Sequence, residues 1–195
     1  LKEIIEQPDF RMPFDIFREH LYSAESLYQG YQLGKPGSYK DSYDQLVYQH
    51  YLSMGKSAAD IKETLARTLH DHSMTHAMND FLSHFDERQV VGIMGGHGLL
   101  RTDEAYQQVV MVSKALAENG CLMVSGGGPG AMEATHLGAW MAGRSESETQ
   151  DALEILKEAP SFKDRLWLET ALQVMQKYPQ EQYVSLGVPT WLYGH

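Results

Sequence analysis

The sequence is poor in cysteine, in long apolar stretches and in positive charge. Its 195 residues include one cysteine, Cys121, so no disulfide framework is possible and a reducing cytoplasm is the expected compartment. No apolar run approaches the roughly 20 residues that span a membrane, and no signal-peptide pattern opens the chain. We therefore expect a cytoplasmic protein with no membrane partner.

Lys and Arg number 16 against 26 Asp and Glu, which gives a formal net charge of −10. A protein that binds a nucleic-acid polymer presents a basic face to the phosphates, so this balance argues against that class. It does not exclude a single nucleotide, because backbone N–H groups bind a phosphate whatever the net charge. The apolar content of 43% is ordinary for a globular protein with a core.

Apolar spacing divides the chain into two parts. Residues 1–86 are predicted to form a helical N-terminal extension, with helical intervals between Phe14 and Tyr28 and again between Tyr43 and Tyr51. Its longest helix is predicted over residues 57–85, where Ser57 is positioned as the cap. An apolar stripe on that helix consists of Ile61, Leu65, Leu69, Met78, Leu82 and Phe85.

Residues 87–195 alternate strands and helices. Short apolar runs predict strands at residues 89–94, 121–125 and 183–186, the first two buried on both faces. Helices are predicted at 102–119, from the following glycine loop to 142, and at 149–158 and 162–178, with Gly120 ending the first. This order predicts an α/β fold with a Rossmann-like doubly wound parallel sheet. Because three strands make a thin sheet and the chain lacks an initiator Met, we expect the sheet to be incomplete in a fragment of a longer protein.

Two glycine turns follow the first two predicted strands, at residues 94–98 and 125–130. Parallel strands bring such turns to the same sheet edge, where open α/β sheets bind their ligands. Glycines admit a ligand close to the backbone, and the N–H groups at a helix start attract an anion. With Pro129 at the first helical position, Gly128 is the expected N-cap. The predicted phosphate-binding residues are Gly95, Gly96, His97, Ser125, Gly126, Gly127, Gly128, Pro129, Gly130, Ala131, Met132 and Glu133.

Other interpretations of these glycines remain open. They also suit tight turns and close helix–strand packing without any ligand. A dinucleotide fingerprint is met loosely by Gly126, Gly128 and Ala131, but Ser125 ends the strand and no acidic residue is placed to hold a ribose. A P-loop at residues 55–57 lacks its first glycine, since His50 stands there.

Several polar residues have two readings each. Glu133 either stabilises the helix start or contacts ribose hydroxyls, and His97 is either a phosphate donor or an ordinary loop histidine. Arg101 either pairs with a phosphate or is an exposed residue at a helix start. The group His70, Asp71, His72 and His76 has metal-ligand types but no His-Glu-x-x-His pattern, so we expect a solvated face and no metal. The aromatic residues Trp167 and Trp191 are expected in the core or an interface, and Tyr193 stays open.

Residues 90–98 and 124–143 together resemble the LOG (Lonely Guy) nucleotide phosphoribohydrolases, also known as lysine decarboxylase-like proteins. The resemblance rests on SGGGPGAMEA at residues 125–134 and the Gly138-Ala139 pair, and extends more weakly to Pro189. It implies hydrolysis of the N-glycosidic bond of a nucleoside 5′-monophosphate, with no cofactor and in a homodimer. It also implies that the two glycine loops hold the nucleotide.

The sequence departs from that family in one important respect. The family's catalytic signature, Pro-Gly-Gly-x-Gly-Thr-x-x-Glu with an arginine before it, is absent from the 195 residues. The catalytic residues are therefore unknown, and we expect the chain alone to be inactive. The alternative is a non-catalytic nucleotide-binding or sensing module.

Overall fold

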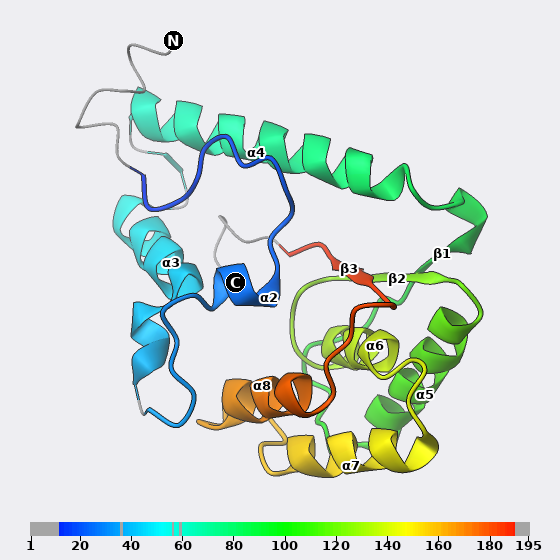
Figure 1. Cartoon of the computed structure of the whole chain (residues 1–195). Helices are drawn as coiled ribbons and strands as arrows, with labels where there is room; N and C mark the ends of the chain where they lie inside the picture. The colour runs from blue at the N-terminus through cyan, green and yellow to red at the C-terminus, as the bar shows by residue number, and fades with distance from the viewer. Residues whose placement is uncertain (1–11, 36, 56, 59, 190–195) are drawn as a thin grey trace. The chain divides into compact units, whose positions relative to one another are not determined.

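The computed structural model describes residues 12–35, 37–55, 57–58 and 60–189 (Figure 1). The chain divides into two compact units at residue 84, and the described part of the second unit is residues 85–189. None of the helices in the described ranges is both long enough and apolar enough to cross a membrane.

The first unit contains the helices α2 (Ala24–Leu27), α3 (Tyr43–Met54) and α4 (Ile61–Leu82), with the 3-10 helix η2 (Ser38–Asp41) before α3. Helical intervals between Phe14 and Tyr28 predicted more helix than forms, since only α2 is helical there. The reason is tertiary packing: Phe14 and Ile16 lie in a non-helical segment and are buried together with Val47 of α3.

Helix α4 buries a different face from the one predicted. It begins after Asp60, whose carboxylate accepts a hydrogen bond from the Glu63 N–H at 2.8 Å, so Ser57 is not its cap. Ile61 of the predicted stripe is 78% exposed, whereas Glu63 and Arg67 are buried. The buried charges satisfy each other: Glu63 accepts from Arg67 Nε at 2.7 Å and lies 2.9 Å from His50 Nε2. Paired charges of this kind can be buried where an unpaired one is too costly.

The second unit is built on three parallel strands, β1 (Val90–Gly92), β2 (Leu122–Ser125) and β3 (Ser185–Gly187), in the order β1-β2-β3. Helix α5 (Glu104–Glu118) connects the first two strands, and α6 (Ala131–Trp140), α7 (Glu146–Lys157) and α8 (Trp167–Lys177) lie between the last two. The short 3-10 helix η3 (Glu87–Gln89) precedes β1. The predicted α/β class with a parallel sheet and N-terminal helices is confirmed. The three described strands follow chain order, without a reversal among them.

The two predicted buried strands differ. Central β2 is buried as expected, with Leu122 at 1% and Met123 at 0% exposure. Strand β1 is only half-buried, and Gly92 at its end is exposed. The prediction of a first strand buried on both faces is therefore wrong, and among the described strands β1 pairs only with β2.

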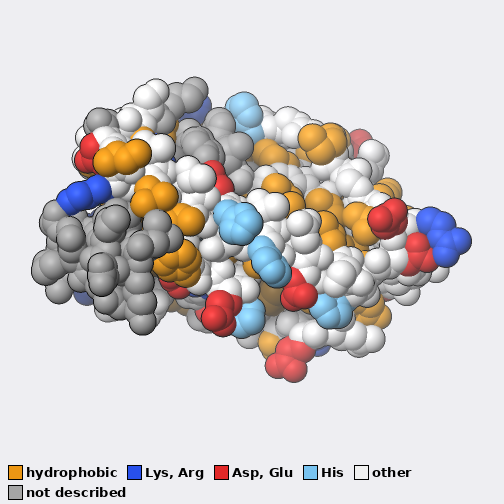
Figure 2. All heavy atoms as spheres, turned by 90° about the horizontal axis from the view of Figure 1, so that it is seen from above, with side chains coloured by type: hydrophobic (Ala, Val, Ile, Leu, Met, Phe, Trp, Pro, Cys, Tyr) orange, Lys and Arg blue, Asp and Glu red, His pale blue; other side chains and the backbone are white. Residues whose placement is uncertain are grey.

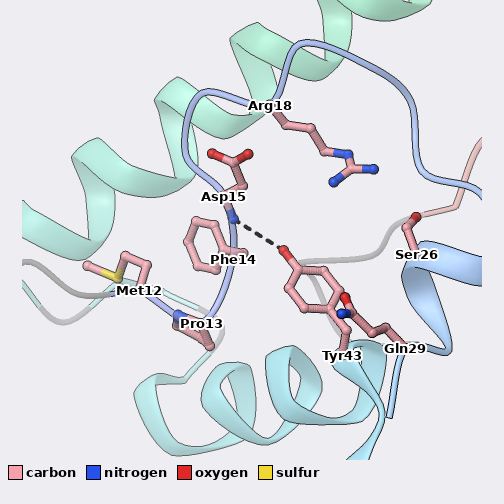
Figure 3. Close-up of a pocket in the computed structure, with 8 residues that line it drawn as sticks. All are labelled: Met12, Pro13, Phe14, Asp15, Arg18, Ser26, Gln29 and Tyr43. Carbon is pink, nitrogen blue, oxygen red and sulfur yellow. Dashed lines mark hydrogen bonds between the residues drawn. The ribbon is translucent and has the colours of Figure 1, made fainter. Parts of the chain in front are cut away.

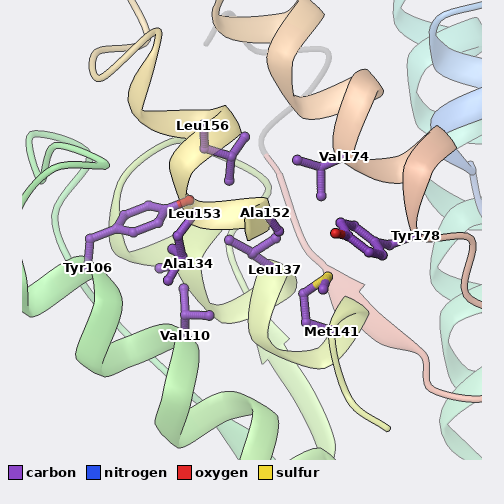
Figure 4. Close-up of a cluster of buried hydrophobic side chains, with 10 residues drawn as sticks. All are labelled: Tyr106, Val110, Ala134, Leu137, Met141, Ala152, Leu153, Leu156, Val174 and Tyr178. Atoms are coloured by element: carbon purple, nitrogen blue, oxygen red, sulfur yellow. The ribbon is translucent and has the colours of Figure 1, made fainter. Parts of the chain in front are cut away.

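One apolar cluster joins the four helices α5 to α8 (Figure 4). Its members are Tyr106, Val110, Ala134, Leu137, Met141, Ala152, Leu153, Leu156, Val174 and Tyr178. Helices α5 and α6 approach so closely that a Cβ on Gly138 would lie 2.4 Å from the Val110 carbonyl oxygen. This packing holds the N-terminus of α6 in place at the edge of the sheet.

Candidate functional site

The carboxyl ends of the three strands are tied together by hydrogen bonds. The Ile93 N–H donates to the Val124 carbonyl at 3.0 Å, and the Ser125 hydroxyl donates to the Ile93 carbonyl at 2.7 Å. The Ser125 carbonyl in turn accepts from the Val188 N–H at 2.9 Å. Ser125 therefore bridges all three strand ends. Both glycine turns start from this common edge.

The two glycine turns contact each other directly. The Ala131 N–H donates to the Gly96 carbonyl at 3.3 Å. A Cβ on Gly95 would lie 2.4 Å from the Ala131 Cβ, and one on Gly130 would lie 2.5 Å from the Gly96 oxygen. Gly130 also has φ +74°, a conformation that side chains disfavour. Only glycine fits at these two positions.

Helix α6 begins at Ala131 with Gly130 as its N-cap, so the prediction of Gly128 as N-cap is wrong. The chain makes its turn at Gly130, after Pro129 rather than before it. A glycine cap has no side chain to accept from the first turn, whereas Ser42, Asp60 and Ser145 cap α3, α4 and α7. The N–H groups of the α6 first turn therefore have no side-chain cap, and the helix dipole favours an anion there.

The glycines of the two turns have different surroundings. Met132 lies against the second turn, because its Sδ would be 2.6 Å from a Cβ on Gly126 and its Cε 2.7 Å from one on Gly128. In the first turn, a Cβ on Gly96 or Gly98 would meet no atom within 4 Å. The second turn is thus a packed backbone, and the first has open space in front of it.

Arg101 follows the first turn and has neither of its predicted roles. Its side chain is 1% exposed. Nε lies 3.1 Å from both carboxylate oxygens of Glu133, and Nη2 also donates to that carboxylate. Nη1 donates to the Ala159 carbonyl at 3.1 Å and to the Thr170 hydroxyl at 2.8 Å. Nη2 makes a further bond of 3.1 Å to the Trp167 carbonyl. Arg101 is therefore a buried tie between the first turn, α6 and the α7–α8 connection, with no N–H directed to a ligand.

Glu133 is held by this tie. Its side chain is 16% exposed, and its carboxylate is occupied by Arg101. The Tyr106 hydroxyl lies close by, and burial, followed by the Glu133 charge, raises the pKa of Tyr106 well above its ordinary value. The geometry favours the helix-stabilising role of Glu133 over a contact to ribose.

His97 and Phe162 form the rim of the site. His97 is exposed, and its backbone lies against Gly130, since a Cβ there would be 3.1 Å from the His97 Cα. The His97 and Phe162 rings meet edge to face with centroids 6.1 Å apart. Phe162 was not among the predicted site residues, because it lies 65 positions after His97 and no local pattern links the two.

His136 supports the second turn from behind and also escaped prediction. Its Nε2 lies 3.3 Å from the Gly126 carbonyl and its Nδ1 2.9 Å from the Ser185 hydroxyl. A carbonyl only accepts, so Nε2 carries the proton, and Nδ1 of the neutral ring accepts from Ser185. Burial lowers the pKa of His136, which keeps the ring neutral. The available signal was its spacing of four from Met132, which places both on one face of α6.

The histidines of α4 do not make a metal site. Among the described residues, no group of three or more His, Cys, Asp or Glu side chains is arranged to hold a metal ion. His72 and His76 are exposed as expected, but His70 is 2% exposed and its Nε2 lies 3.0 Å from the Tyr22 hydroxyl. The prediction of a solvated face is therefore wrong for His70. Trp191 and Tyr193 lie outside the described residues.

The first unit has a separate cavity of about 370 Å³ (Figure 3). It is lined by Met12, Pro13, Phe14, Asp15, Arg18, Ser26, Gln29 and Tyr43. The Asp15 N–H donates to the Tyr43 hydroxyl at 3.2 Å on its wall.

The face of the molecule drawn in Figure 2 carries scattered acidic and histidine side chains, with Lys and Arg at isolated points. The described side chains on that face form no basic patch of the kind that holds a nucleic-acid polymer.

The comparison with protein families supports the assignment of the second unit. Residues 88–145 match the SLOG cluster4 family (LDcluster4), which is related to the LOG and lysine decarboxylase-like proteins of the SLOG superfamily. The match includes both glycine turns, α5 and α6. No significant match is found among curated proteins or among solved structures.

Proposed function

We propose that the two glycine turns of the second unit bind a nucleoside 5′-monophosphate. The observation that carries the proposal is the uncapped first turn of α6, set between two glycine turns within a SLOG-family domain. The phosphate is held by backbone N–H groups of residues 126–128, 130, 132 and 133, since Pro129 has no N–H and the Ala131 N–H donates to the Gly96 carbonyl, and the helix dipole stabilises its charge. The open space in front of Gly96 and Gly98 admits the rest of the nucleotide.

The predicted site residues divide by role under this proposal. Gly126, Gly127 and Gly128 bring the backbone to the phosphate, and the Met132 side chain packs against Gly126 and Gly128. Gly95, Gly130 and Ala131 join the two turns. Ser125 fixes the strand ends. His97 faces the ligand from the rim, and Glu133 holds the start of α6 through Arg101.

We further propose that this site belongs to a phosphoribohydrolase, which releases the free base and ribose 5-phosphate from its substrate. Cleavage of that bond passes through an oxocarbenium-like state, which a carboxylate near C1′ stabilises. The family resemblance assigns that carboxylate to a signature absent from these 195 residues. Under this proposal the phosphoribohydrolase is a cytoplasmic homodimer, and the residue that supplies this carboxylate is unknown.

A non-catalytic nucleotide sensor is the second candidate, and one observation favours it. Glu133, the carboxylate of the two glycine turns, is occupied by Arg101 rather than directed at a ligand. A site with bound phosphate and no available carboxylate binds without cleaving. The two candidates differ in turnover and agree on binding.

The decisive experiment for binding is calorimetric titration of the 195-residue chain with AMP, GMP, CMP and UMP, and with the matching nucleosides. We expect at least one monophosphate to bind, and its nucleoside to bind at least about tenfold more weakly for want of the phosphate. The bound monophosphate also raises the melting temperature. Equal affinity for the nucleoside and its monophosphate would contradict the phosphate site.

Two variants provide the control. Gly128→Asp places a carboxylate where the phosphate is expected, but its Cβ also displaces the flexible Met132 side chain. Gly96→Asp introduces the same charge at a position where a Cβ meets no atom within 4 Å, so stability is retained. We expect both to abolish monophosphate binding, and Gly96→Ala to keep it. A chromatographic assay of the full-length protein then separates hydrolase from sensor, because only a hydrolase releases the free base and ribose 5-phosphate.

A further inference from the structure

The connection between α7 and α8 brings an aromatic side chain to the rim of the glycine turns. Phe162 is 42% exposed, although most large apolar side chains of the surrounding core are buried. Its ring contacts His97, whose backbone lies against the N-cap of α6. His97 of the first turn therefore lies between Phe162 and the expected phosphate position at the start of α6.

This segment is fixed rather than loose. The Ser161 N–H donates to the Asp164 carboxylate at 2.7 Å, and the Asp164 N–H donates back to the Ser161 carbonyl at 2.8 Å. The Arg101 N–H donates to the Pro160 carbonyl at 3.0 Å, and the Arg101 side chain holds the Ala159 carbonyl. Hydrogen bonds within the turn that carries Phe162 thus fix its conformation. Arg101 links this turn to the segment that follows the first glycine turn.

We propose that Phe162 is the stacking platform for the base of the bound nucleotide, and so a specificity-determining residue. This inference rests on the proposed nucleotide site. An exposed aromatic ring offers a face on which any base stacks favourably. The Lys163 ammonium lies over this ring, 5.8 Å from its centre, and adds positive charge beside it. With the phosphate on α6 and the base on Phe162, the ribose lies across His97.

The platform has a consequence for ligand choice. A stacking surface accepts any base through its π-face, so Phe162 separates ligands with a base from ligands without one. Ribose 5-phosphate shares the phosphate and the sugar of the nucleotide and lacks the base. The two ligands therefore report on the platform and on the phosphate site separately.

The test is calorimetric titration of wild type and Phe162→Ala with the tightest monophosphate and with ribose 5-phosphate. We expect Phe162→Ala to weaken monophosphate binding by about tenfold or more, and ribose 5-phosphate binding by less than about twofold. Phe162→Trp keeps the ring and is expected to retain monophosphate affinity. The matched control is Phe17→Ala, which removes a 49% exposed phenylalanine from the first unit and is expected to change neither affinity.

Two results with Phe162→Ala would overturn the platform. One is unchanged monophosphate affinity in Phe162→Ala, and the other is an equal loss for both ligands, which would mean that the substitution only disturbs the turn. If wild type binds ribose 5-phosphate as tightly as the monophosphate, the result supports the phosphate site and contradicts stacking of the base on Phe162. If wild type binds neither ligand, both proposals fail.

Discussion

The two glycine turns lie side by side and are built in opposite ways. In the second turn, Met132 packs against Gly126 and Gly128, and His136 bonds to the Gly126 carbonyl. In the first turn, Gly96 and Gly98 face open space. The difference shows that glycines in such a sequence serve two purposes, close packing and space for a ligand. The second turn needs Gly126 and Gly128 for packing, whereas the first turn needs only Gly95 for packing and leaves room at Gly96 and Gly98 that a ligand can fill.

The buried Arg101–Glu133 pair joins the two turns, and breaking it is expected to have the largest effect. Arg101→Met leaves the Glu133 carboxylate without its partner in a site where it is 16% exposed. Removing one partner of a buried pair typically costs about 3–5 kcal/mol. We expect a loss of this size in the free energy of unfolding, measured by urea denaturation with the slope compared between variants.

A double variant sharpens this first prediction. In Arg101→Met with Glu133→Met, no charge is left unpaired, so part of the lost stability returns. Recovery stays incomplete because the Ala159 and Trp167 carbonyls also lose their donor. If Arg101→Met unfolds at the same urea concentration as wild type, the tie between the turns carries no stability.

The contrast between packed and open glycines is tested by one substitution in each turn. Gly130→Ala places a side chain at φ +74° with its Cβ 2.5 Å from the Gly96 oxygen. The backbone conformation alone costs about 1–3 kcal/mol. Gly96→Ala meets no atom within 4 Å, so its stability stays within about 0.5 kcal/mol of wild type. Thermal and urea unfolding of the two variants check this; equal losses would remove the distinction between the turns.

Sequence patterns predicted the second unit better than the first. Short apolar runs and glycine turns are local signals, and they placed the three strands, α5 and the two turns near their observed positions. In the first unit, the buried face of α4 carries Glu63 and Arg67, which a hydrophobic pattern assigns to solvent. Such burial depends on partners from other segments, and His50 comes from α3.

The same reasoning explains which parts of the site escaped prediction. Arg101 is buried because carbonyls and a hydroxyl at positions 156–170 converge on it, and the packing of α7 and α8 brings them there. Phe162 reaches the rim by that same packing. The glycine turns, by contrast, are encoded by consecutive residues. Local motifs thus located the two glycine turns, which we propose bind the phosphate, and the remainder of the candidate site depends on contacts distant in sequence.

His136, which bonds to the Gly126 carbonyl in the second turn, is expected to make the stability of the protein depend on pH. We expect this effect to be smaller than that of the Arg101 and Gly130 substitutions. Burial lowers the pKa of His136 below the ordinary value of about 6.5. As the pH falls through 6.5, His136 becomes protonated in the unfolded chain and stays neutral in the folded protein. The free energy of unfolding therefore declines from about pH 6.5 downward, until the pH reaches the lowered pKa of the folded state. Carboxylates with lowered pKa values, such as Glu118, stay ionised through this range.

His70, whose pKa burial also lowers, contributes a decline of the same sign from the first unit. The two contributions are separated by His136→Gln and His70→Gln, each unfolded with urea at several values between about pH 7.5 and pH 5. We expect each variant to show a shallower decline than wild type. A slope in His136→Gln equal to that of wild type would mean that His136 takes up its proton in the folded protein. The Gly126 carbonyl would then accept its hydrogen bond from a charged ring at low pH, and His136 would give the second turn no pH-dependent stability.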